Sequence, residues 1–200
     1  MGIRNTIRAF QLPNLRTMFT VVFLYTLGFS FFTQFFPYLL VQKFAFNQSQ
    51  IGDLFGYVGL MIAITQGLIT GVVAKRVSPE TTLKISFFAL AILLYGLVMV
   101  NTSAMLYVML TILPIVNGLT WPTSSALVSN LAGKESQGEV LGINQSLQSL
   151  GQALPPVISG LIATISADLP LIAASVVTLA AWTVFMVFYR KTEQTKFHEV

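Results

Sequence analysis

Apolar runs of about 20 residues or more recur along this chain, with short polar segments between them. Lipid offers no hydrogen bonds to backbone amides. Within a bilayer, a run of this length therefore pairs all its backbone N–H and C=O groups only as a helix. Hydrophobic residues make up 54% of the 200 and charged residues 9%, against roughly 25% charged in soluble domains. The sequence therefore predicts an all-α integral membrane protein.

Six transmembrane spans are predicted, with approximate bounds 15–42, 51–74, 80–100, 103–131, 137–165 and 168–189. Together they form a bundle over 15–190, preceded by a polar segment, 1–14, and followed by a polar tail, 190–200. The first apolar run is about 25 residues, which is too long for the core of a removable signal peptide. We therefore expect it to be retained as the first span.

The basic residues predict the orientation of the bundle. With the N-terminus in the cytoplasm, ten of the eleven Lys and Arg residues fall in inner segments, and Lys43 alone falls outside. Cytoplasmic loops of membrane proteins carry an excess of Lys and Arg. The pattern predicts a multi-pass protein of the cell (inner) membrane with both termini cytoplasmic. The net charge of +4 is thus a topology signal, and nucleic acid is not an expected partner.

The spans alternate in polarity along the chain. Amide side chains occur at depth in the first, second, fourth and fifth spans, whereas the third and sixth have none. The order polar, polar, apolar therefore occurs twice, which indicates two three-helix repeats. Because three is an odd number, the second repeat must be inverted in the membrane.

The fifth span has an amide-rich face. At 100° per residue, the side chains of Asn144, Gln145, Gln148 and Gln152 share one side of the helix. Lipid cannot bond these amides, so we expect this face to lie against other helices or a water-filled cavity. The second span has instead a stripe of small residues, which lets a neighbouring helix approach closely. That stripe includes Gly52, Gly56, Gly59 and Gly67.

Two motifs carry a family resemblance. The loop after the second span, GVVAKRVSPETTL, is similar to the G-x-L-A-D-R-x-G-R-K-x-x-L motif of the major facilitator superfamily, and it keeps Gly71, Ala74, Arg76 and Leu83. It departs from the motif over 75 and 78–80. The fifth span resembles the G-x-x-x-G-P-x-x-G-G pattern of antiporters through Gly151, Pro156 and Gly160.

The chain thus resembles the C-terminal half, six helices of twelve, of a transporter in the drug:proton antiporter or tetracycline-efflux-like group. The resemblance implies alternating access, with a small-molecule substrate held near the bilayer midplane. It also implies that the first and fourth spans line the cavity, the second and fifth form the seam between halves, and the third and sixth face lipid. Expected cavity residues are Gln34, Asn117, Trp121, Gln148 and Gln152. Expected residues of the cavity wall or seam are Gln66, Asn144 and Gln145.

Each of these assignments has a structural alternative. Amides in membrane helices also hold helices together, and Trp121 is also consistent with an interfacial aromatic belt. Arg76 can serve as a topology determinant instead of a gating residue, and the glycines of the second span can serve packing alone.

The middle of every span lacks charged residues, so this half predicts a neutral cavity wall. Apolar or weakly polar substrates are therefore favoured, and any proton-coupling carboxylate is expected in an N-terminal six-helix half. That half, or a second copy of the chain, is the expected partner. The alternative is a six-helix homo-oligomeric channel or a non-transporting membrane scaffold.

An enzyme is not expected. The sole histidine, His198, lies in the tail, and the sequence has no cysteine. Neither an intramembrane Ser/His pair nor a His-rich zinc site can form from these residues. The sequence predicts no cofactor and no metal.

Overall fold

The computed structural model describes residues 12–132, 136–163, 165, 166 and 168–189, apart from the side chains of 157, 159–161 and 163. The regular structure of these residues is helical, with the elements α2 (Pro13–Phe44), α3 (Gln48–Ile64), the π-helix η1 (Thr65–Ile69), α4 (Thr70–Arg76), α5 (Pro79–Met99), α6 (Ser103–Leu131), α7 (Gln137–Ala163) and α8 (Leu169–Phe188). The predicted tail 190–200 and most of the segment 1–14 lie outside the described residues.

Five of these helical segments are long and apolar enough to cross a bilayer, with α3, η1 and α4 acting as one continuous segment. The sixth, α7, has similar length, but its amides keep its hydropathy below that of the others. The all-α fold with six membrane helices predicted from the sequence is confirmed.

Local side chains fix where several helices begin. Ser78 accepts a hydrogen bond from the Thr81 N–H, and Pro79 occupies the first turn of α5, where a missing N–H costs nothing. Asn47 and Gln50 form a reciprocal capping box at the start of α3. These caps end the loops abruptly, so consecutive spans reverse direction within a few residues.

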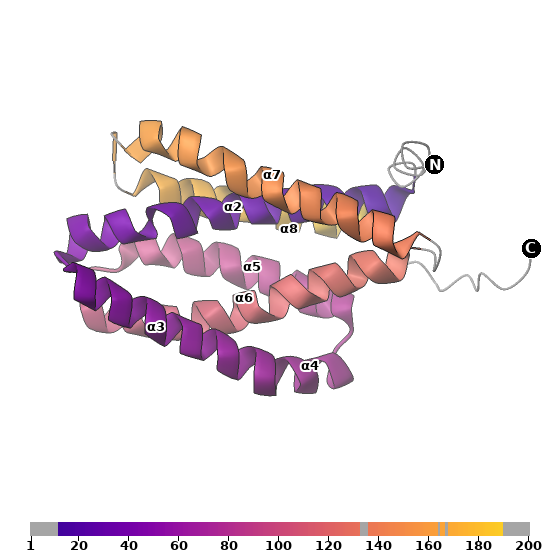
Figure 1. Ribbon diagram of the computed structural model, residues 1–200, viewed down its shortest axis with the longest axis horizontal. Helices are drawn as coiled ribbons and strands as arrows, with labels where there is room; N and C mark the ends of the chain where they lie inside the picture. Colours follow the sequence, from indigo (N-terminus) through magenta and orange to yellow (C-terminus); the bar gives the residue numbers. More distant parts are fainter. Residues whose placement is uncertain (1–11, 133–135, 164, 167, 190–200) are drawn as a thin grey trace, which may run out of the picture.

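The two halves of the bundle are interlocked (Figure 1). The first repeat consists of α2, α3–η1–α4 and α5, and the second of α6, α7 and α8. α2 packs on α7 and α8 of the second repeat, while α6 packs on α3 and α5 of the first, and α5 also contacts α8. Exchanging the repeats reproduces this set of contacts, which confirms the pair of inverted repeats.

Consecutive spans run in opposite directions, so the bundle has two distinct ends (Figure 1). Arg16 at the start of α2, Arg76 at the end of α4 and Lys84 near the start of α5 share one end. Lys43 lies at the other end, where its Nζ donates to the Val98 carbonyl at 2.7 Å and stands 3.8 Å from Asp168 Oδ1. Lys43 thus ties together the ends of α2 and α5 and the start of α8.

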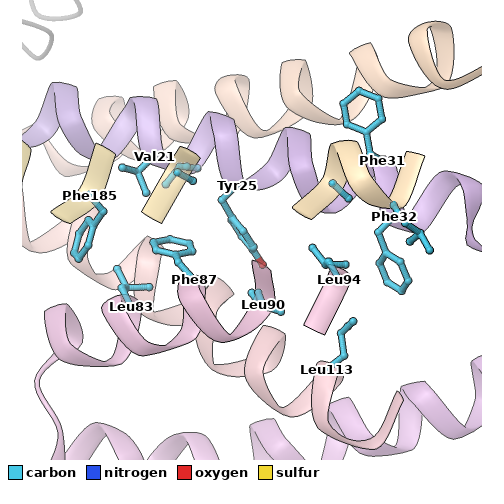
Figure 2. Packing of buried hydrophobic residues seen from close by; sticks show 14 of the residues in the cluster. Val21, Tyr25, Phe31, Phe32, Leu83, Phe87, Leu90, Leu94, Leu113 and Phe185 are labelled. Carbon is cyan, nitrogen blue, oxygen red and sulfur yellow. The ribbon is translucent and has the colours of Figure 1, made fainter. Parts of the chain in front are cut away.

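Two glycines let α2 lie close to both of its main neighbours. A Cβ at Gly28 would come within 2.6 Å of Thr178 Oγ1 and 3.0 Å of the Ala174 carbonyl oxygen on α8. A Cβ at Gly151 of α7 would come within 3.1 Å of the Leu27 nitrogen on α2. Neither contact leaves room for a larger side chain. The side chain of Tyr25 on α2 points into the apolar core, toward Phe87, Leu90 and Leu94 (Figure 2).

The segment α3–η1–α4 is the least covered of the six. Its buried side chains are Leu54 and Thr65. Among the described residues, no other helix makes the predicted close approach at these glycines, because none of its heavy atoms lies within 4 Å of a Cβ built at Gly52, Gly56 or Gly59. α6 instead approaches at the π-helix, where a Cβ at Gly118 would stand 3.0 Å from Thr65 Cγ2.

Candidate functional site

The centre of the candidate site is a polar contact between α2 and α6. Tyr25 is 1% exposed, and its hydroxyl donates a 2.5 Å hydrogen bond to Asn117 Oδ1. Trp121, one turn further along α6, meets the Tyr25 ring edge-on with centroids 6.2 Å apart. Asn117 and Trp121 are both partly buried. Two of the predicted cavity residues therefore gather around one tyrosine between the first helices of the two repeats.

Two amides of α7 are also turned inward. Asn144 and Gln148 are each 3% exposed. One turn beyond Gln148, the tight contact at Gly151 presses α7 against α2, and Ser30 Oγ donates to the Gln152 carbonyl at 3.3 Å. α2 is therefore flanked by polar side chains of both α6 and α7.

Two buried oxygens in this region have no hydrogen-bond partner among the described residues. They are Thr26 Oγ1 on α2 and Asn144 Oδ1 on α7. Leaving such a group unpaired costs about 1–3 kcal/mol, and native proteins do so rarely. A side chain whose only role is to join two helices by a hydrogen bond would be paired. The unpaired oxygens therefore favour a different role for Asn144.

The remaining predicted amides lie on the surface of the chain. Gln34 of α2, Gln66 of η1, and Gln145 and Gln152 of α7 are exposed. The amide-rich face of α7 is thus divided, with Asn144 and Gln148 packed inward and Gln145 and Gln152 outward. Lipid cannot form hydrogen bonds with the outward amides, so this surface requires a polar neighbour, which the described part of the chain does not supply.

The motif residues differ in their surroundings. Gly71, Ala74 and Arg76 are exposed on α4, and Arg76 has no ion pair with any described residue. Gly151 lies in the tight contact with α2, whereas Pro156 is exposed in α7. Gly160 also belongs to α7, but its environment lies outside the described residues.

Sequence reasoning missed Tyr25. The available signal was a lone phenol within the apolar stretch VVFLYTLGF, because a buried tyrosine hydroxyl usually finds a partner. A similar pair, Tyr57 and Thr111, joins α3 to α6 with their hydroxyls 2.6 Å apart. Among the described residues, no group of three or more His, Cys, Asp or Glu side chains could hold a metal ion.

Interlocked inverted repeats with amides on their facing helices define one bundle of a membrane transporter fold. The chain belongs to the Major Facilitator Superfamily, whose sequence profile matches residues 18–199.

Relatives and a solved structure agree with this membership. The chain is 30% identical over 152 residues to the mouse Major facilitator superfamily domain-containing protein 10, a match that covers 74% of this chain and 32% of that protein. It is 26% identical over 117 residues to the class E tetracycline resistance protein of Escherichia coli, covering 58% and 29%.

The crystal structure of the human organic anion transporter MFSD10 (TETRAN) superposes with a TM-score of 0.77 at 22% identity, covering 85% of this chain and 40% of that one. The fold is therefore shared. Each match spans less than half of the relative's length, in keeping with one six-helix half.

Proposed function

We propose that this chain is the C-terminal half of a secondary transporter that exports small apolar or weakly polar molecules by alternating access. The observation that carries the proposal is the unpaired, buried Asn144 oxygen beside α2, on the same helix as Gln148. In one conformation such an oxygen remains unsatisfied, and in another it can bond water, substrate or a partner helix. A transporter that alternates between two packings would leave this oxygen unpaired in one state and pair it in the other, which explains why the energetic cost is kept.

The substrate class follows from the neutral wall. Tyr25, Asn117, Trp121 and Gln148 offer hydrogen bonds and aromatic surface but no charge. A wall of this kind suits apolar or weakly polar molecules, and the similarity to a tetracycline resistance protein favours export. An organic anion, the kind of substrate for which the human transporter MFSD10 is named, would need a cationic partner from the other half.

The exposed surface of α3 and the outward amides of α7 support pairing with a second six-helix unit. We assign this role to an N-terminal half, which would also supply the proton-coupling carboxylate, or to a second copy of the chain. The clustering of Arg16, Lys75, Arg76 and Lys84 at one end supports an inner-membrane orientation with both termini in the cytoplasm.

The test is substrate export by the complete transporter. Asn117→Leu and Gln148→Leu should each lower export of a fluorescent dye substrate at least several-fold while membrane abundance is unchanged. Gln42→Leu, at the exposed end of α2, is the matched control and should leave export intact. Equal loss of abundance and export would assign the two amides to folding alone.

The same assay separates a transporter from a channel. A proton-coupled exporter moves the dye against its gradient and stops when a protonophore collapses the proton gradient. Dye flow that only follows its own gradient and ignores the protonophore would instead support a homo-oligomeric channel.

A further inference from the structure

An apolar groove lies on the outer surface of the bundle, away from the candidate site. It has a volume of about 500 Å³ and is lined by residues of α5, α6 and α8. α5 packs between the other two helices, so its exposed side chains Ile85, Phe88 and Ile92 run along the groove. Trp182 of α8 and Ile112 of α6 line it from either side.

The groove has one charged lining residue, Lys84, and it lies at one end. Trp182 is fixed beside it, because its Nε1 donates to the Lys84 carbonyl at 3.0 Å and its ring packs on Phe88 with centroids 5.0 Å apart. A lysine in a membrane helix extends its ammonium toward the headgroup region while its methylenes remain in the apolar layer. A cation therefore stands where the groove opens toward the membrane surface.

The length of the groove fits one leaflet. Lys84 and Ile92 are eight residues apart on α5, which is about 12 Å along the helix axis, and one leaflet of hydrocarbon is about 15 Å deep. We propose that the groove binds an anionic phospholipid, with one acyl chain along Ile85, Phe88 and Ile92 and the phosphate paired with the Lys84 ammonium. Basic pockets between membrane helices are suited to such headgroups.

The charges around the groove's end agree with this occupant. Lys75 and Arg76 lie at the same end of the bundle and outweigh Glu80, one turn before Lys84.

Trp182 can report directly on this lipid. The full chain carrying Trp121→Phe, which leaves Trp182 as its sole tryptophan, is placed in phosphatidylcholine vesicles containing a minor fraction of brominated phosphatidylglycerol or brominated phosphatidylcholine. Bromine quenches tryptophan only at short range. We expect the anionic lipid to quench on the order of fivefold more effectively at equal mole fraction.

Lys84→Gln should abolish this preference, while Lys84→Arg should retain it. The matched control is Lys75→Gln, which removes a charge from the same end outside the groove and should leave most of the preference. Equal quenching by both lipids, or equal losses in Lys84→Gln and Lys75→Gln, would overturn the site. If Trp121→Phe does not insert, the difference in quenching between the unmodified chain and Trp182→Phe gives the same measurement.

Discussion

At the scale of residues, variants of the Tyr25–Asn117 contact distinguish a role in joining helices from a role in the substrate cavity. Tyr25→Phe keeps the ring but leaves Asn117 Oδ1 without its hydrogen-bond donor, so we expect a loss of about 1–3 kcal/mol in the free energy of unfolding. Asn117→Leu removes the same bond together with the amide. If the amide serves the substrate, export falls much further in Asn117→Leu than in Tyr25→Phe. Parallel losses in thermal stability and export across both variants would mean that the pair only joins the helices.

Asn144 gives the opposite prediction for stability. Its Oδ1 is buried without a partner among the described residues, so Asn144→Leu removes an unsatisfied group and keeps a similar branched shape. We expect the melting temperature of the purified transporter to rise or stay constant while export declines, as at other functional sites where activity and stability compete. A clear drop in melting temperature would show that the amide supports the fold.

At the scale of elements, Gly28 determines how closely α2 and α8 pack together. Gly28→Val would place methyl groups against Thr178 and the Ala174 carbonyl, and overpacking of this kind costs about 1–3 kcal/mol. Gly56→Ala is the control, since no described residue of another helix has an atom within 4 Å of a Cβ at this position. Thermal unfolding of the chain in detergent should show destabilisation for Gly28→Val and little change for Gly56→Ala. Comparable stability of both variants would contradict the tight α2–α8 contact.

The elements also show how much of the fold could be predicted from the sequence. Apolar length and the positions of the amides predicted six helices and two inverted repeats, because both follow from how lipid treats backbone and side-chain polar groups. Which amides of α7 turn inward depends on where α2 approaches, and Gly151 sets that position. The partner of Asn117 is Tyr25, which lies 92 positions away in the sequence and follows no periodic pattern. Such pairings arise from tertiary packing, so they could not be predicted.

At the scale of the whole molecule, the uncovered face of α3 predicts where a second bundle docks. Gly59→Leu adds bulk at a surface that no other helix of the described residues contacts, so membrane insertion and bundle stability should be retained. Association with the second six-helix unit should fall, measured by co-purification of a tagged partner half or of a second tagged copy. Ala180→Leu, on the exposed surface of α8, is the control that should leave association unchanged. Undiminished co-purification of Gly59→Leu would place the seam elsewhere.

The π-helix η1 has a consequence for this docking surface. A turn closed by backbone bonds between residues i and i+5, such as the one from the Thr70 N–H to the Thr65 carbonyl, holds one residue more than an α-turn. Everything beyond it is rotated by about 100° relative to an unbroken α-helix. Around an unbroken α-helix Gly71 would lie about 100° from Gly52, so the rotation at the π-turn brings these two glycines back to one side. The small residues before the π-turn and Gly71 after it therefore form one ridge, which a single neighbouring helix can contact along its length.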